Sequence, residues 1–114
     1  MKIIYNRLLP VKGFAAITLF GMIFARREFR PLTERTIRHE NIHKAQAHDH
    51  GRWFWAWIVF HLKYLWYCAW FGYTANPFEK EAYMWDFDED YLLRRPSPRR
   101  WPWSIKKVND LILS

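Results

Sequence analysis

The sequence contains a single cysteine, Cys68, among its 114 residues. One cysteine cannot form a disulfide within the chain, which excludes the small secreted scaffolds that disulfides hold together. A chain of this length buries only about two thirds of the surface that it exposes when unfolded, so its core alone gives a thin margin of stability. Because no disulfide adds to that margin, we expect a bound metal, a partner or a membrane surface to contribute.

The sequence also predicts neither a signal peptide nor a membrane-spanning helix. The apolar run at residues 14–25 is shorter than the roughly 20 residues that cross a bilayer as a helix, and it has no cleavage site. Residues 53–73 are long enough, but they carry His61 and Lys63 near their middle and have aromatic residues throughout. We therefore expect a cytoplasmic protein in which this aromatic segment is buried or lies at a membrane surface.

Aromatic residues are abundant, with 8 Trp, 9 Phe and 6 Tyr, and so apolar a chain is not expected to be disordered. The net charge is +7, from 18 Lys and Arg against 11 Asp and Glu. Acidic residues gather at 79–90 and basic residues at 94–107, so the two blocks can neutralise each other in the folded protein. We therefore expect no nucleic-acid partner.

Three main helices are predicted, and each has a recognisable start or end. Thr33 is a typical N-cap for the first helix, and Gly72 is a typical terminator for the second. Asn76 followed by Pro77 is a typical start for the third, because proline suits the first helical position. The three predicted helices cover residues 34–50, 52–71 and 77–95.

An apolar N-terminal region and a basic C-terminal region flank these helices. Residues 14–29 suit a pleated surface and predict one long strand or a hairpin, with Gly21 as a bulge or turn. Three prolines after Arg95 predict an extended basic segment with a short helix beyond it. The predicted fold class is therefore α+β, with a compact domain over residues 1–95 and a basic tail, rich in Pro and Trp, over residues 96–114.

The first predicted helix contains the sequence His39-Glu40-Asn41-Ile42-His43, which has the pattern H-E-x-x-H. Helical spacing places His39 and His43 one turn apart on one face, where both imidazoles can bind the same Zn²⁺. Glu40 is rotated by about 100° from His39, so it can address an attacking water rather than the metal. The motif therefore predicts a zinc site in which Glu40 acts as a general base.

A catalytic zinc site needs a third protein ligand and an open fourth position. The metzincin pattern does not supply that ligand, because the positions of its glycine and its third histidine hold other residues. His50 lies about 16 Å along the helix axis from His39, which is too far for one ion. We expect His48 and His50 to be exposed at the helix end, and the candidate ligands are the carboxylates of Glu79 and Glu81 in the third helix.

The stretch Phe78-Glu79-Lys80-Glu81-Ala82-Tyr83, together with the H-E-x-x-H motif, resembles the gluzincin metallopeptidases. Their second helix has a Glu ligand in a Phe-Glu-x-x-Ala-Asp type of stretch, so the resemblance implies Glu79 as the third ligand. Tyr83 stands where relatives often have an Asp that supports a ligand histidine; its hydroxyl fills that role, or the role is absent. Residues 10–92 are also similar to small uncharacterised bacterial zincin-like proteins, which implies a minimal zincin-like domain with a metallopeptidase-like site.

Two alternatives for Glu79 stay open at this point. Glu79 follows Asn76 by three residues, the spacing of a capping box, in which the carboxylate bonds back to the helix start. The true ligand can also be Glu81. The residue that stabilises an oxyanion is equally open, and the candidates are His61, Tyr73, Tyr83 and Tyr91.

The sequence therefore predicts a zinc-dependent metallopeptidase that cleaves a peptide or protein substrate, with the strand region at 14–27 available to pair with it. Glu40 is the predicted general base, and the predicted zinc ligands are His39, His43 and Glu79. One alternative is a zinc-stabilised binding or regulatory protein without turnover. Another is a membrane-surface interaction protein built on the aromatic helix, whose excess of Trp can also serve a homo-oligomer contact.

Overall fold

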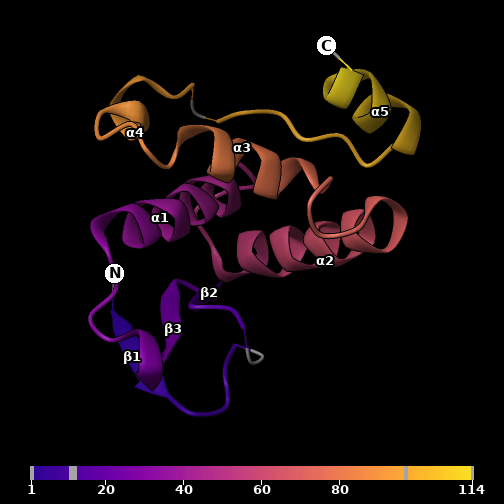
Figure 1. The fold of residues 1–114 in the computed structure, drawn as a ribbon. Coiled ribbons are helices and arrows are strands. Elements are labelled where there is room, and N and C mark those ends of the chain that lie inside the picture. The colour runs from indigo at the N-terminus through magenta and orange to yellow at the C-terminus, as the bar shows by residue number, and fades with distance from the viewer. Residues whose placement is uncertain (1, 11–12, 97, 114) are drawn as a thin grey trace.

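The computed structural model describes residues 2–10, 13–96 and 98–113, and it has an α+β fold in which a small sheet lies beside a layer of helices (Figure 1). The strands are β1 (Ile3–Asn6), β2 (Ala16–Leu19) and β3 (Met22–Arg26). β3 is the central strand: β1 pairs with it in parallel and β2 pairs with it antiparallel. The predicted fold class is confirmed, and β2 is left at an edge of the sheet.

The strand region predicted over 14–29 is a hairpin rather than one long strand. β2 and β3 are joined by Phe20 and Gly21, whose φ angles are 49° and 85°. Positive φ at both central residues is typical of the two-residue hairpin turn whose twist matches the strands, and glycine adopts it without strain. The chain then leaves the sheet through a short 3₁₀ turn, η1 (Arg27–Phe29).

The predicted helix starts and ends are largely confirmed. α1 (Glu34–His48) begins after Thr33, whose side chain accepts a hydrogen bond from the Thr36 amide. α2 (Phe54–Phe71) ends at Gly72, which has a φ of 80°. α3 (Pro77–Trp85) begins after Asn76, whose side chain accepts from the Phe78 amide. Two shorter helices follow, α4 (Tyr91–Arg94) and α5 (Ile105–Leu113).

The third helix is shorter than predicted, because it ends at Trp85 and does not continue to residue 95. Asp86 is its C-cap residue, and its carboxylate is turned back to α1, where it binds Arg35 and His39. Acidic residues follow at 88–90, and negative charge at a helix C-terminus opposes the helix dipole. The chain therefore turns here and starts α4 separately. The first and second helices each differ from their predicted ranges by two residues, as 34–48 and 54–71.

The main core lies between α1, α2 and α3 and is largely aromatic. Its buried residues include Phe60 and Tyr67 from α2 and Phe78 from α3. Trp101, in the region predicted as a basic tail, packs against Phe78 with 4.5 Å between ring centroids. The Lys63 ammonium reaches the same segment and donates to the Trp101 carbonyl at 2.6 Å. The segment after α4 is thus attached to the helical layer.

A buried ion cluster fixes that attachment. The Arg95 side chain is 2% exposed, and its guanidinium donates to Asp49 at 2.6 Å and to Glu81 at 2.6 Å. Burial alone would lower the pKa of Arg95, but the two carboxylates raise it above its usual value. The Tyr91 hydroxyl also donates to Glu81. The cluster joins the end of α1, the middle of α3 and the chain after α4.

We predict that Arg95→Met lowers the free energy of unfolding by about 3–5 kcal/mol, because the buried Asp49 loses its ion-pair partner and the buried Glu81 keeps the more distant Arg99, at 3.4 Å, as its counter-ion. The matched control is Arg94→Met: Arg94 is 57% exposed and pairs with Asp88, so its loss is expected to cost at most about 1 kcal/mol. Urea unfolding measures both. Equal, small effects of the two substitutions would contradict the role assigned to this cluster.

Candidate metal centre

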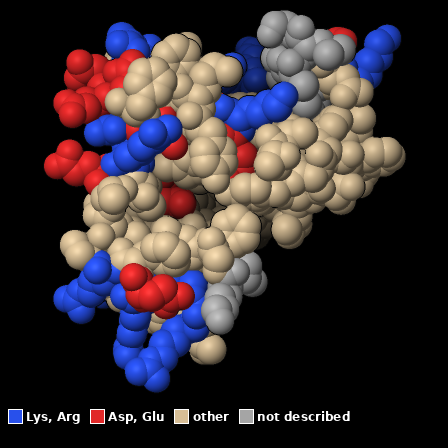
Figure 2. All heavy atoms as spheres, in the orientation of Figure 1, with Lys and Arg blue, Asp and Glu red and all other residues tan. Residues whose placement is uncertain are grey.

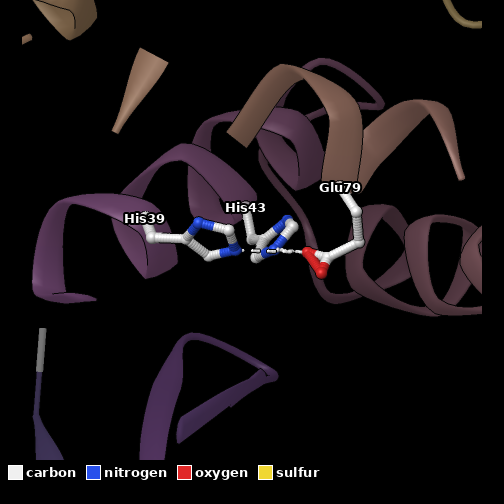
Figure 3. A group of neighbouring side chains, drawn as sticks. All are labelled: His39, His43 and Glu79. Atoms are coloured by element: carbon white, nitrogen blue, oxygen red, sulfur yellow. Dashed lines mark hydrogen bonds and ion pairs between the residues drawn. The ribbon is translucent and has the colours of Figure 1, made fainter. Parts of the chain in front are cut away.

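The structure brings together the three side chains that the sequence predicts as metal ligands (Figure 3). His39 and His43 come from successive turns of α1, and Glu79 comes from the first turn of α3. The Nε2 atom of His39 lies 3.3 Å from Glu79 Oε1, and Nε2 of His43 contacts the same oxygen. All three residues are buried, and their ligand atoms lie within 4.8 Å of one another.

This donor set fits a zinc ion. Zinc bonds to His nitrogen and carboxylate oxygen are about 2.0–2.2 Å long, so the ligand atoms around one tetrahedral ion lie roughly 3–4 Å apart. The observed separations permit this with small side-chain movements. Two imidazoles and one carboxylate also make a common set for catalytic zinc, with the fourth position left to water or substrate.

Both histidines are oriented by a hydrogen bond on their other ring nitrogen. His39 Nδ1 lies 3.0 Å from Asp86 Oδ2, and His43 Nδ1 lies 2.8 Å from Gln46 Oε1. The Gln46 amide nitrogen donates to the Phe78 carbonyl, so its oxygen faces His43. Because a carboxylate and an amide oxygen only accept, both Nδ1 atoms must carry the proton. That tautomer leaves both Nε2 atoms free to bind a metal, as in many carboxylate–histidine–zinc sites.

Asp86 is the supporting residue that the sequence analysis missed. For Tyr83 two options were open, that its hydroxyl supports a ligand histidine or that this role is absent; the hydroxyl bonds to Tyr73 at 2.8 Å and not to a histidine. The Tyr83 ring instead packs edge-on against the His39 ring, with centroids 4.5 Å apart. Asp86 lies seven residues after Glu79, which is two helical turns and therefore the same face of α3. That spacing was a visible signal in the sequence.

The structure separates the two candidate carboxylates. Glu79 faces the histidines, whereas Glu81 is turned to the opposite side and bonds to Gln46, Tyr91 and Arg95. The capping-box alternative also differs from what is observed, because the Asn76 amide donates to the Tyr73 carbonyl. Of the two, only Glu79 is placed to complete a ligand set with His39 and His43.

Glu40 lies beside this cluster and is held by the sheet. Its Oε2 accepts a hydrogen bond of 2.6 Å from the hydroxyl of Thr18, a buried residue of β2. Glu40, His43 and Glu79 line one continuous cavity. The carboxylate is thus close to the ligand set without belonging to it, which is the placement required of a general base. Thr18 lies within the predicted strand region at residues 14–29 but was not predicted as a site residue, and its hydrogen bond sets the orientation of the Glu40 carboxylate.

The cluster shifts the pKa values of its members in opposite directions. Burial alone would lower the pKa of His43, but the contact with Glu79 and the nearby charge of Glu40 outweigh it and raise that pKa to about 9. Burial alone would raise the pKa of Glu79, but its hydrogen bonds with His39 and His43 hold it well below its usual range. Without a metal, Glu79 is therefore a carboxylate whose charge is balanced by a proton on His43. A metal ion binding here would displace that proton.

The candidate oxyanion-stabilising residues are placed differently from one another. Tyr73 and His61 line the same cavity as Glu40, His43 and Glu79, and burial raises the pKa of the Tyr73 hydroxyl above its usual value. Tyr83 lines a second, smaller hollow on the His39 side. Tyr91 belongs to the ion cluster around Glu81 and lies outside both cavities.

The two histidines at the end of α1 are not part of the candidate site. His48 is exposed, as predicted, whereas the prediction of an exposed His50 is wrong. His50 is half-buried, packs against Phe60 and Phe78, and donates from Nδ1 to the Gln46 carbonyl. It lies in the aromatic core because the chain turns back at Gly51 to start α2.

Comparison with known proteins gives no match: no protein family, no curated protein and no solved structure is recognisably similar to this chain. We therefore infer its function from the geometry of the site.

We predict that Asp86→Asn weakens zinc binding about tenfold or more. Loss of the negative charge next to His39 Nδ1 makes the imidazole less basic, so its Nε2 atom is a weaker metal ligand. Asp90→Asn is the matched control, since Asp90 is an exposed residue beyond the same helix. Competition with a chromogenic chelator measures both affinities. If the two substitutions change the affinity equally, the support that Asp86 gives to His39 has no bearing on the metal.

Proposed function

We propose that this protein is a zinc-dependent metallopeptidase. The observation that carries the proposal is the convergence of His39 and His43 from one helix with Glu79 from another, beside a carboxylate, Glu40, that takes no part in the cluster. The three donors would hold Zn²⁺. A zinc ion supplies Lewis acidity and lowers the pKa of a bound water toward about 7.

The remaining chemistry is assigned to the chain's own residues. Glu40 takes a proton from the attacking water and passes it to the leaving amine, while Thr18 holds the carboxylate in position. Tyr73 lies in the same cavity as Glu40, and its raised pKa keeps its hydroxyl protonated and able to donate to an oxyanion. Asp86 and Gln46 keep the two imidazoles in the tautomer that binds metal.

Two features favour a catalytic metal site over a purely structural one: the number of protein ligands, and a cavity through which a substrate can reach the metal position. Structural zinc sites have four protein ligands, whereas catalytic sites have three and an open position. Among the described residues the group that could hold a metal has three members. A cavity of about 470 Å³ reaches two of them, His43 and Glu79, together with Glu40. A substrate therefore has a route to the candidate metal position.

Two substitutions test the proposal. Glu40→Gln is expected to retain about one zinc per chain and to lose cleavage of a denatured protein substrate by a factor of at least about 100, since it removes the general base. Glu79→Ala is expected to lose most of the zinc, whereas the control Glu89→Ala, at an exposed position, retains it. Elemental analysis and a casein-cleavage assay are the measurements. Zinc in the wild type without any cleavage, but with a fall in melting temperature on chelation, would indicate the zinc-stabilised binding protein instead.

A membrane surface is a second candidate partner, and one observation favours it. Among the described residues no helix has the length and hydropathy needed to cross a bilayer. The outward face of α2 nevertheless has no charged residue, because Lys63, the one charged residue of that helix, is buried. Figure 2 shows this surface as a continuous region without Lys, Arg, Asp or Glu. Its exposed members, between 44% and 72% accessible, are Phe54, Trp55, Leu62, Leu65, Trp66 and Trp70.

We infer that this face lies against an anionic bilayer surface, because Trp is favoured at the membrane interface and the net charge of +7 adds attraction. Flotation with vesicles containing phosphatidylserine is expected to recover the wild type and several-fold less of Trp55→Ser/Trp66→Ser. Phe87→Ser, at a 62% exposed position outside α2, is the control and is expected to float like the wild type. A concentration-dependent dimer that dissociates in the double variant, with no vesicle binding, would assign the face to a second copy of the chain.

A further inference from the structure

The cavity that reaches the candidate metal centre extends well beyond it. It has a volume of about 470 Å³, within the range of pockets that bind small ligands. One end is formed by Glu40, His43 and Glu79. The rest is formed by β2, by α2 and by neighbouring loop residues, and the residues that line it include Phe14, Ile17, Leu19, Phe60, Tyr64 and Leu65.

The chemistry of this lining differs sharply between the two ends. Beyond the metal end, the described residues that line the cavity include no Lys, Arg, Asp or Glu. Of the polar side chains there, His61 is already engaged, because its Nε2 accepts from the Phe20 amide at 3.3 Å. A charged group entering this region would lose its water without gaining a counter-ion. An apolar group would replace water at an aromatic and aliphatic surface.

The sheet gives the cavity a direction. β2 is an edge strand that pairs with β3 on one side, and all four of its residues, 16–19, line the cavity together with Phe20 of the turn. An extended chain that lies along such an edge presents alternate side chains to the two sides. One of them would then enter the apolar region while the backbone next to it lies at the metal end.

We propose that the apolar part of this cavity is a specificity pocket, and that it takes a large aromatic or long aliphatic side chain next to the bond that is cut. This inference rests on the proposed function, because it assigns the substrate class of the same site. The preferred substrates are then peptides with residues such as Phe or Leu at that position, and peptides with Asp, Glu, Lys or Arg there are rejected.

The test uses binding of hydroxamates, which chelate zinc, to the zinc-loaded full chain and needs no turnover. Acetohydroxamate probes the metal alone, 3-phenylpropanohydroxamate adds an apolar arm, and the hydroxamate of succinate adds a charged arm of similar reach. Burial of one aromatic side chain corresponds to about a 10- to 100-fold gain in affinity. We expect that gain for the phenyl compound over acetohydroxamate, and no gain for the charged one, in isothermal titration calorimetry.

Two double variants test whether the gain in affinity of the phenyl compound comes from the apolar part of the cavity. Phe14 and Leu65 line the cavity and are 41% and 64% exposed, so Phe14→Ser/Leu65→Ser removes apolar wall with little effect on the core. We expect it to reduce the gain at least about threefold and to leave acetohydroxamate binding unchanged. The control is Leu62→Ser/Met84→Ser, at positions 56% and 61% exposed outside the cavity, and it is expected to keep the full gain.

The possible outcomes distinguish failure of the pocket proposal from failure of the proposed metal centre. If acetohydroxamate binds but the three compounds have equal affinity, or the charged arm binds tightest, the pocket proposal is overturned while the metal centre stands. A gain that is equally large in both double variants also overturns it. If the protein takes up no zinc, or no hydroxamate binds the zinc-loaded protein, the proposed function fails and the pocket proposal fails with it.

Discussion

The contact between the Glu79 carboxylate and the imidazoles of His39 and His43 is the constraint around which the helices are arranged. Glu79 is 2% exposed, and a buried carboxylate is costly unless it is paired. The groups that pair with it come from α1, so the first turn of α3 must lie against the middle of α1. In this arrangement a metal ion and a proton are alternative ways of balancing the same buried charge.

The contacts around the cluster join it to the rest of the chain. Gln46 links His43 to Glu81, and Glu81 in turn binds Arg95, which also holds Asp49. Asp49 accepts from the indole nitrogen of Trp101 at 2.8 Å, so this series of buried polar contacts runs from the candidate site to the C-terminal segment. On the other side, Thr18 connects Glu40 to the sheet. The site is therefore supported by elements that lie far apart in the sequence, as a pre-organised site requires.

The features that could be predicted from the sequence depend on residues within one or two helical turns of one another. The caps Thr33 and Asn76 act within one helical turn, and the H-E-x-x-H spacing fixes the relation of His39 to His43, so both predictions hold once a helix forms. The rest depends on contacts between elements. Pairing of β1 with β3 is parallel and joins distant residues, and the end of α3 is set by Asp86 binding across to α1. The choice of Glu79 over Glu81 likewise needs the packing of α3, because sequence spacing alone allows either.

We propose that one metal ion lies between α1 and α3, bound by His39, His43 and Glu79. Anomalous diffraction from crystals of the zinc-loaded protein, recorded on both sides of the zinc absorption edge, tests it most directly. We expect a single strong peak within about 2.3 Å of Nε2 of His39, Nε2 of His43 and a carboxylate oxygen of Glu79. A zinc peak at another place on the chain, with these three side chains bonded only to one another, would contradict it.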